Sequence, residues 1–293
     1  SDQEGDMHPL SGLKVIELAR VLAGPWIGQT LADLGADVTK VESPDGDDTR
    51  AWGTNTITKG DDTSAAYFHS TNRGKRGITC DFTDPEALGR LKEMIAEADV
   101  LIENFKVGGL KKYGLDYETI ASLNPRLIYC SVTGFGQESP RSHKAGYDFM
   151  IQGMTGIMDI TGEPDGQPMK LGVAFADVFT GLYGVIGIQA ALAQRQRTGR
   201  GQHVDMALFD CMLAAQANQN MNYLSTGLSP SRMGNTHPNI VPYQVFPVAD
   251  RHIIIACGNH RQFHNLARTL GREDWVEHPN CADNLARLKN RDA

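Results

Sequence analysis

The chain has 293 residues, of which 41% are hydrophobic and 22% are charged, a composition typical of globular enzymes. Its formal net charge of −7 argues against non-specific nucleic-acid binding, and no apolar run reaches the roughly 18 residues that a membrane-spanning helix needs. The five scattered cysteines lack a CxxC spacing, which favours thiols in a reducing compartment over a disulfide framework or a zinc site. We therefore expect a cytoplasmic protein (or, in a eukaryote, one of the mitochondrial matrix) without nucleic-acid or membrane partners.

The first six residues, Ser1–Asp6, are acidic and polar. Signal peptides and transit peptides have apolar or arginine-rich segments instead. We expect residues 1–6 to be either a disordered start or a remnant ahead of a natural start at Met7.

Short apolar runs alternate with helical patterns over the first 135 residues. Strands are predicted at residues 14–18, 37–42, 100–103 and 127–132, and helices at residues 25–34 and 84–98. Pro25 opens the first helix and Gly35 follows its end, the usual order of these two residues around a helix. Strands that alternate with helices form parallel sheets covered on both faces. The sequence therefore predicts a Rossmann-like α/β large domain.

From Asp148 onward the pattern is mainly helical, and it changes again near residue 229. Gly181, Gly184 and Gly187 lie three residues apart in a predicted helix, where each glycine costs about 1 kcal/mol, so we expect another backbone to pack closely there. Residues 244–248 and 252–257 have the pattern of a β-hairpin. We predict a large domain at residues 1–228 and a smaller α+β domain at residues 229–293, incomplete at its C-terminal end if the chain is a fragment.

Two basic, glycine-containing segments follow or precede predicted strands. Residues 71–77 contain Arg73, Lys75 and Arg76, and residues 104–112 contain three further lysines. Ligands of parallel sheets bind outside the carboxyl ends of the strands, and Arg and Lys beside glycines suit phosphate groups. For any single one of these residues, the alternative to phosphate binding is that it belongs to a solvated basic surface. Their joint position in a net-acidic chain favours a phosphate-bearing ligand.

Other classes of site have weaker support. The turn at residues 19–25 contains no G-x-G-x-x-G, which argues against an NAD(P)-dependent oxidoreductase. His260 and His264 lie four residues apart without a third ligand, so no metal site is predicted, and no G-x-S-x-G motif indicates a serine hydrolase. Asp177, taken alone, is better explained as an acid favoured by the positive end of a helix dipole.

Ordered motifs along nearly the whole chain resemble the class III CoA transferases, also called the CaiB/BaiF family. The motifs are residues 10–18, 23–25, 34–42, 72–76, 98–105, 124–128, 133–136, 146–148 and 198–205. In appearance the chain is most similar to members that transfer CoA from succinyl-CoA to glutarate-type dicarboxylates. The resemblance implies an acyl-CoA and a carboxylic acid as substrates, with no tightly bound cofactor.

The resemblance also implies the site residues. The family's nucleophilic aspartate falls on Asp177, which would carry the acyl group. Its contacts to CoA fall on Arg20, Val21, Leu22, Ala23, Asn72, Arg73, Lys75, Arg76, Asn104, Phe105 and Lys112. A family position that can hold an arginine near the adenosine is Ser43 here. A carboxylate with a pKa of about 3.9 would be ionised at neutral pH without a general base.

Two departures from the family pattern bear on the substrate. The racemase branch has a histidine before the aspartate, where this chain has Tyr147 before Asp148, and a racemase needs two proton carriers. A glycine run that closes over oxalate-type substrates is replaced here by residues 234–243, which include His237 and Tyr243. We therefore expect Tyr147, Asp148, His237 and Tyr243 to line the substrate pocket.

Several alternatives remain open at this point. They are a 2-methylacyl-CoA racemase of the same family, an oxidoreductase, a non-catalytic CoA-binding module and a monocarboxylate as acceptor. Family chains interlock as dimers and usually continue beyond the second domain to complete the first. The resemblance thus implies a homodimer and a chain that is a fragment or is completed by other means.

Overall fold

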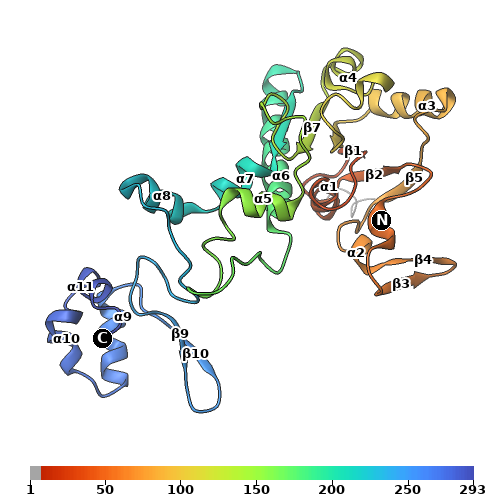
Figure 1. Ribbon diagram of the computed structural model, residues 1–293. Coiled ribbons are helices and arrows are strands. Elements are labelled where there is room, and N and C mark those ends of the chain that lie inside the picture. The colour runs from red at the N-terminus through yellow and green to blue at the C-terminus, as the bar shows by residue number, and fades with distance from the viewer. Residues whose placement is uncertain (1–7) are drawn as a thin grey trace. The chain divides into compact units, whose positions relative to one another are not determined.

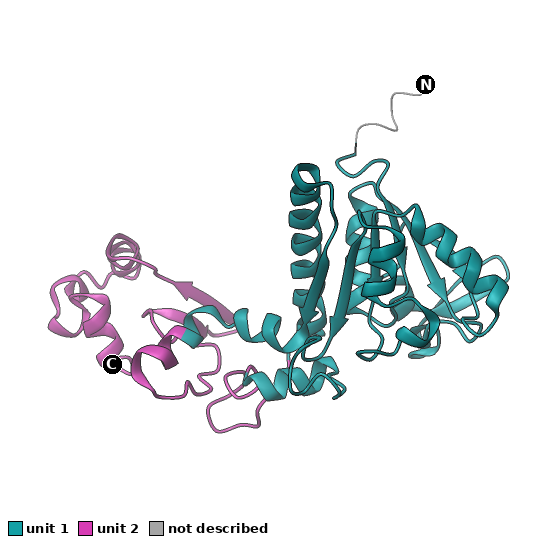
Figure 2. Cartoon of the chain, turned by 90° about the horizontal axis from the view of Figure 1, so that it is seen from above, with its two compact units in different colours: residues 1–156, 171–220 teal, residues 157–170, 221–293 magenta. Residues whose placement is uncertain are grey.

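The computed structural model describes residues 8–293, so the expectation for residues 1–6 lies outside the described range. The chain divides into two compact units (Figure 2). The first extends to Gly156 and includes Leu171–Asn220, and the second comprises Ile157–Lys170 and Met221–Ala293. The predicted domain boundary near residue 229 thus differs from this division, which falls at residue 220. The division also assigns residues 157–170, which were predicted to belong to the large domain, to the second unit.

A six-stranded parallel sheet forms the centre of the first unit (Figure 1). Its strand order is β5-β2-β1-β6-β7-β8. The strands are β1 (Lys14–Glu17), β2 (Asp37–Glu42), β5 (Arg76–Thr79), β6 (Val100–Glu103), β7 (Ile128–Thr133) and β8 (His203–Ala207). From β1 the chain first adds β2 and β5 on one side of the sheet. It then returns to the other side of β1 and adds β6, β7 and β8. The predicted α/β class and parallel sheet are confirmed, and the switch in direction between β1 and β6 is where such sheets bind ligands.

Helices cover both faces of this sheet. These are α3 (Pro85–Ala96) and α4 (Tyr117–Leu123) on one face and α1 (Ala23–Asp33) and α6 (Phe175–Thr198) on the other. The unit also contains α2 (Ala66–His69), α5 (Asp148–Thr155) and α7 (Leu208–Ala214), and α8 (Ala217–Thr226) contains residues of both units. The sheet residues Ile16, Leu101 and Tyr129 share a buried cluster with Leu91 of α3 and Ile120 of α4. Because side chains alternate across a strand, Val15, Val100 and Ile102 face the opposite side, where α1 and α6 pack.

The shorter elements of the first unit are the hairpin of β3 (Thr56–Lys59) and β4 (Asp62–Ala65) and the 3-10 turns η2 (Asp48–Ala51) and η3 (Lys111–Tyr113). Turn η2 begins at Asp47, whose side chain accepts a hydrogen bond from the Thr49 N–H. Both turns follow strands of the sheet at its carboxyl edge. They therefore belong to the loops that surround the ligand-binding end.

Helix α6 packs against α1 through Gly181 and Gly184, whereas Gly187 faces Val204 of β8. A Cβ atom on Gly181 would lie 3.1 Å from the Ala23 carbonyl oxygen, and one on Gly184 would lie 2.5 Å from Ile27. The expected close approach of another backbone is thus confirmed. By length and composition α6 could cross a membrane, the one such helix among residues 8–293. Its glycine face packs on α1 within the first unit.

The second unit contains the antiparallel hairpin of β9 (Tyr243–Pro247) and β10 (His252–Ala256), as predicted. Its helical elements are α9 (His260–Thr269), α10 (Asp274–Glu277), η4 (Pro279–Cys281) and α11 (Asn284–Lys289). The buried Arg287 of α11 donates to the carbonyl oxygens of Val241 (2.7 Å) and Cys281 (2.9 Å) and lies over the Phe263 ring. One side chain therefore joins α11, α9 and the segment before β9.

Replacing Gly184 with valine should destabilise the first unit by about 1–3 kcal/mol, because the new side chain would overlap Ile27, which is fully buried. Urea unfolding followed by circular dichroism measures the change. Gly89→Ala is the matched control, since Gly89 lies on the exposed side of α3 with nothing within 4 Å of an added Cβ. That change should stabilise the chain by about 0.5–1 kcal/mol. Equal effects of the two substitutions would contradict the packing described for α6.

Candidate functional site

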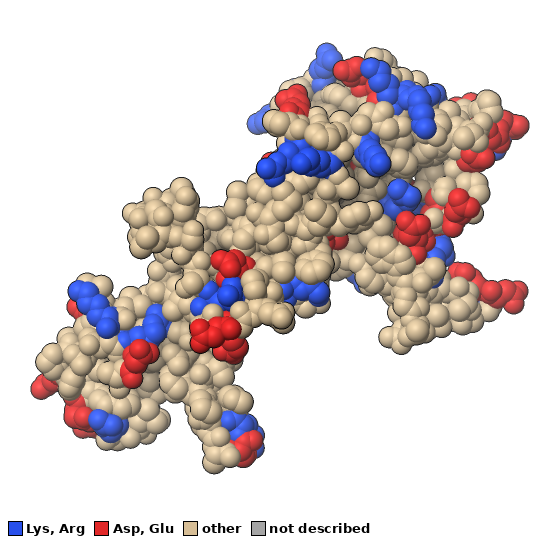
Figure 3. All heavy atoms as spheres, viewed as in Figure 1, with Lys and Arg blue, Asp and Glu red and all other residues tan. Residues whose placement is uncertain are grey.

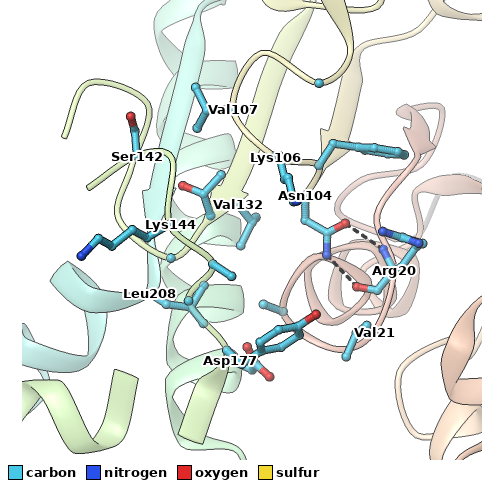
Figure 4. Close-up of a pocket in the computed structure, with 18 of the residues that line it drawn as sticks. Arg20, Val21, Asn104, Lys106, Val107, Val132, Ser142, Lys144, Asp177 and Leu208 are labelled. Atoms are coloured by element: carbon cyan, nitrogen blue, oxygen red, sulfur yellow. Dashed lines mark hydrogen bonds between the residues drawn. The ribbon is translucent and has the colours of Figure 1, made fainter. Parts of the chain in front are cut away.

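A cavity of about 430 Å³ lies at the carboxyl ends of β1 and β6, at the switch in strand direction (Figure 4). Its walls come from the turn after β1, the loop after β6, the end of β7, the loop before α5 and the first turns of α6 and α7. The lining includes Arg20, Val21, Leu22, Ala23, Asn104, Phe105, Lys106, Val132, Ser142, His143, Lys144, Gly146, Tyr147, Asp177 and Leu208. Residues predicted separately from the sequence, on several different segments, therefore surround one cavity.

The first wall is a pair of loops joined by one amide side chain. Asn104 Oδ1 accepts a hydrogen bond from the Arg20 N–H (3.0 Å), and Asn104 Nδ2 donates to the Arg20 carbonyl oxygen (2.7 Å) (Figure 4). The Arg20 guanidinium lies 5.5 Å from the centre of the Phe105 ring. Asn104 thus lies at the cavity as predicted, but its side-chain amide forms both of these hydrogen bonds with the backbone of the loop after β1.

The opposite wall contains residues that the sequence analysis did not single out. Ser142, His143 and Lys144 line the cavity beside Gly146. A Cβ atom on Gly146 would lie 2.5 Å from the Cα atom of Gly134, so the two backbones touch and bring this loop to the end of β7. The signal in the sequence was a polar, basic segment between two glycines. This segment does not directly follow the predicted strand at residues 127–132, so its position after that strand gave no indication of a ligand site.

Lys106 and Lys144 belong to the lining of the cavity, one on each of these walls. Neither side chain forms an ion pair with another residue of the described chain. Over the face that Figure 3 shows, acidic and basic side chains otherwise lie interspersed. Ammonium groups that are not neutralised locally remain available to an anionic ligand such as a phosphate.

Asp177 lies in the first turn of α6 and is half-buried at the cavity wall. Its N–H donates to Oδ1 of Asp148, the first residue of α5 (3.1 Å), and Oδ2 of Asp148 accepts from Gln152 Nε2 (2.7 Å). Burial, and secondarily the negative charge of Asp148, raises the pKa of Asp177 to about 7. The sequence-based assumption of an ordinary carboxyl pKa was therefore wrong, because it could not foresee the second carboxylate or the desolvation.

Tyr67 of α2 is a further residue close to this carboxylate that no motif indicated. Burial and the charges of Asp177 and Asp148 raise the pKa of its phenol to about 12. The ring packs edge-on against Trp52, with 5.3 Å between the ring centres. Tyr67 therefore stays a neutral hydroxyl at neutral pH.

The predicted basic cluster at residues 72–76 does not line the cavity. Arg73 and Arg76 are exposed and form ion pairs with Asp33 (2.6 Å) and Asp37 (2.8 Å). The Lys75 side chain is only 2% exposed and lies 2.8 Å from Glu17. Lys75 therefore has a structural role that the sequence analysis missed, whereas contact of Arg73 and Arg76 with CoA stays a prediction.

Two other predicted CoA contacts also lie off the cavity lining. Asn72 Nδ2 donates to the Phe68 carbonyl oxygen (2.7 Å), and Asn72 Oδ1 accepts from Lys75 Nζ (2.8 Å). The Lys112 ammonium lies 4.9 Å from the centre of the Tyr113 ring. The roles proposed for both residues stay predictions.

A second cavity of about 220 Å³ adjoins the same strands and includes Ser43 in its lining. Arg20 and Phe105 line both cavities. Phe82 lies between Phe105 and Tyr113, with ring centres 6.0 Å and 5.3 Å apart. The two cavities together offer cations and aromatic faces along the carboxyl edge of the sheet.

His237 and Tyr243 belong to the second unit. Their rings meet edge-on with 4.9 Å between centres, and His237 Nδ1 accepts a hydrogen bond from the Asn239 N–H (3.0 Å). Their predicted place in the substrate pocket stays a prediction. Among residues 8–293, no group of three or more His, Cys, Asp or Glu side chains is arranged to bind a metal ion.

Comparison with known proteins identifies the family. A sequence model of CoA-transferase family III matches residues 10–293. The chain is 57% identical over 294 residues to a succinate–glutarate CoA-transferase of Agrobacterium fabrum, which covers 99% of the chain and 74% of that relative. It is 42% identical to a succinyl-CoA:glutarate CoA-transferase of Mus musculus, covering 97% of the chain and 65% of the mouse protein.

The fold agrees with this assignment. A crystal structure of a CaiB/BaiF family protein from Brucella suis superimposes with a TM-score of 0.86 at 63% identity, covering 97% of the chain and 75% of that protein. The chain thus spans about two thirds to three quarters of the length of these relatives. The resemblance seen in the motifs is confirmed, and the chain belongs to CoA-transferase family III.

Proposed function

We propose that this family III CoA-transferase moves CoA between two carboxylic acids through acyl intermediates on Asp177. The observation that carries the proposal is a half-buried carboxylate in the wall of a cavity that also presents the side chains of Lys106 and Lys144. Carboxylates can act as covalent nucleophiles when a site positions them. The cavity has the form such a reaction needs, since one wall carries the nucleophile and both carry cations for an anionic substrate.

The proposed steps balance without a further reactant. The Asp177 carboxylate attacks the thioester carbonyl, the carbon–sulfur bond breaks, and a mixed anhydride and CoA thiolate form. The thiolate attacks the Asp177 carbonyl carbon, which releases the first acid and leaves an aspartyl–CoA thioester. The incoming carboxylate attacks that thioester to form a second anhydride, and the thiolate then takes the new acyl group and frees Asp177. Positioning and backbone N–H donors would offset the weak nucleophilicity of a carboxylate.

The two cavities suggest how CoA is held. Phosphates suit the ammonium groups of Lys106 and Lys144, and the guanidinium of Arg20 lies between the larger and the smaller cavity. The aromatic rings of Phe82, Phe105 and Tyr113 give the smaller cavity faces on which a purine base can stack. We propose the adenosine end of CoA there, with the thioester end toward Asp177.

We further propose succinyl-CoA as donor and a glutarate-type dicarboxylate as acceptor. The names of the Agrobacterium and mouse relatives support this substrate class. A dicarboxylate needs a cationic or hydrogen-bonding partner for the carboxylate that does not react. His143 and Lys144 line the cavity wall opposite Asn104, and His237 is the candidate from the second unit. Arg232 of the second unit is less suited to this role, because it forms an ion pair with Asp159 (2.8 Å).

We also propose that the protein acts as a homodimer. Large apolar side chains on α5, α6 and α8 are exposed, including Phe149 (58%), Ile186 (63%) and Leu224 (70%). Exposed apolar surface of this kind marks interfaces in soluble proteins.

Asp177→Asn should lower turnover by about 10³-fold or more while free CoA still binds, since the amide cannot form the anhydride. Hydroxylamine added with succinyl-CoA should place a hydroxamate on Asp177, read by mass spectrometry. Asp45→Asn, at an exposed aspartate, is the control. Turnover of the Asp177→Asn variant within about tenfold of the parent would rule out the covalent mechanism.

The pH dependence of kcat/KM should follow the ionisation of Asp177. Because the reactive form is the anion and its pKa is raised to about 7, the rate should rise through neutral pH and level off above it. Asp148→Asn removes the negative charge that opposes this ionisation, so the rising limb should move to lower pH. Burial persists, which keeps the midpoint above the ordinary aspartate value. A midpoint that stays in place or moves upward, with Asp45→Asn as control, would refute the assigned role of Asp148.

A panel of acceptors with succinyl-CoA as donor tests the substrate class. Glutarate should exceed pentanoate in kcat/KM by about tenfold or more, because the two acids have the same chain length and differ in the second carboxylate. A higher efficiency for pentanoate would overturn the dicarboxylate assignment without affecting the family. Exchange of the α-hydrogen of a 2-methylacyl-CoA in heavy water, without an acceptor, would instead favour racemase activity.

A further inference from the structure

The turn between β1 and α1 holds Val21 in an unusual backbone conformation. Its φ angle is +73°, in the left-handed region that β-branched residues rarely adopt because Cβ crowds the backbone. Val21 also lines the 430 Å³ cavity (Figure 4). A backbone conformation this unfavourable persists only where the surrounding structure holds it.

The group that holds Val21 is the carboxylate of Asp47. The Val21 N–H donates to Asp47 Oδ2 (3.2 Å) and Oδ1 (3.4 Å). The Asp47 side chain is fully buried, and its Oδ1 also accepts from the Thr49 N–H (3.0 Å) and hydroxyl (2.7 Å). The acceptor that faces Val21 is therefore fixed in place.

Lys40 of β2 connects this carboxylate to the rest of the turn. Its ammonium lies 3.0 Å from Asp47 Oδ2 and donates to the Ala19 carbonyl oxygen (2.9 Å) and to Glu17 Oε2 (3.2 Å). The three donors of the ammonium thus have three partners. Lys40 holds Ala19 directly and Val21 through Asp47, on either side of Arg20.

Lys40 lines neither cavity, and Asp47 lines the 220 Å³ cavity but not the 430 Å³ cavity. Helix α1 begins at Ala23, directly after the turn, without a side-chain cap at Leu22. The conformation of Val21 therefore sets where the first N–H groups of α1 meet the cavity. A change at Lys40 would therefore reach the ligand only through the shape of this turn, whereas a change at Asp47 would also alter the lining of the 220 Å³ cavity.

We propose that Lys40 and Asp47 are positioning residues for the acyl-CoA substrate, which they serve by holding Val21 left-handed and so fixing the turn at residues 19–23. The inference rests on the proposed function, because it takes CoA to be the ligand of this cavity. It assigns no chemical step to either residue. Their effect should fall on the affinity for CoA rather than on the reaction of Asp177.

Calorimetric titration with free CoA tests the inference. Asp47→Asn should weaken CoA binding by about tenfold or more, since a shifted turn misplaces the contacts that it makes. The same change in a Val21→Gly background should weaken binding by less than about threefold, because glycine adopts positive φ without steric cost and needs no holding group. Asp99→Asn is the matched control: it also removes an ion-paired aspartate, 2.9 Å from Arg195, but at the opposite end of β6.

Circular dichroism checks the fold of each variant. If Asp47→Asn does not fold, Val21→Pro replaces it, because proline leaves the ion pair intact while it forces φ negative and removes the N–H. That variant should also lose about tenfold or more in CoA affinity. The inference would be overturned, without affecting the proposed function, if Asp47→Asn or Val21→Pro left the affinity for CoA unchanged. It would also be overturned if Asp47→Asn caused the same loss of affinity in the unmodified chain and in the Val21→Gly background. Failure of the unmodified chain to bind CoA would overturn the proposed function and this inference together.

Discussion

Two lysine ammonium groups are buried under the β1–α1 turn, and the carboxyl end of the sheet depends on their neutralisation. Lys40 and Lys75 are each 2% exposed, and Glu17 and Asp47, both fully buried, supply the two opposing charges. Burying an unpaired ion costs several kcal/mol, and removing one partner of a buried pair typically costs about 3–5 kcal/mol. The four charged side chains therefore have to be buried together. Their ion pairs connect β1, β2 and the segment before β5.

The pairing of Lys75 shows how strongly this interior disfavours charge. Its ammonium contacts Glu17 and the carbonyl oxygens of Pro25 and Thr71 (both 2.8 Å). Burial nevertheless lowers the pKa of Lys75 to about 8, because the attraction of Glu17 only partly offsets desolvation. The network is therefore a framework that holds α1 and its neighbouring loop against β1, and its lysines are not free for a ligand.

Asp177 is also buried at a cost to its charged form, and in its case the proposed activity requires that charged form. Its pKa in the folded chain, about 7, lies above the ordinary aspartate value of about 3.9. A raised carboxyl pKa stabilises the fold below the unfolded-state pKa, and this contribution is lost as the pH rises through the folded-state value. The proposed nucleophile, once ionised, is thus held in surroundings that disfavour its charge, as is common at active sites.

Much of the first unit could be predicted from local pattern. The apolar runs, the Pro25 and Gly35 signals and the glycines of α6 identified the sheet and its main helices correctly. Lys75 could not be assigned, because an inward-facing lysine and an outward-facing arginine look alike in one basic segment. Glu17 and Lys40, charged residues within strands that were expected to lie inside a covered sheet, were the available signal for the buried network. The excursion at residues 157–170 carries no such signal.

The distribution of cations decides which part of the protein can meet a polyanionic ligand. With a net charge of −7, the chain as a whole repels such a ligand, so binding has to come from local charge that is not already neutralised. Lys40, Lys75 and Arg50 are committed to Glu17, Asp47 and Glu42. Arg20, Lys106 and Lys144 lack such partners within residues 8–293 and line the cavity. The cations in ion pairs thus stabilise the fold around the cavity, whereas the three unpaired cations of its lining are available to a ligand. A carboxylate introduced next to Lys106 would therefore weaken the binding of a polyanionic ligand more than the loss of any one surface arginine that is already paired.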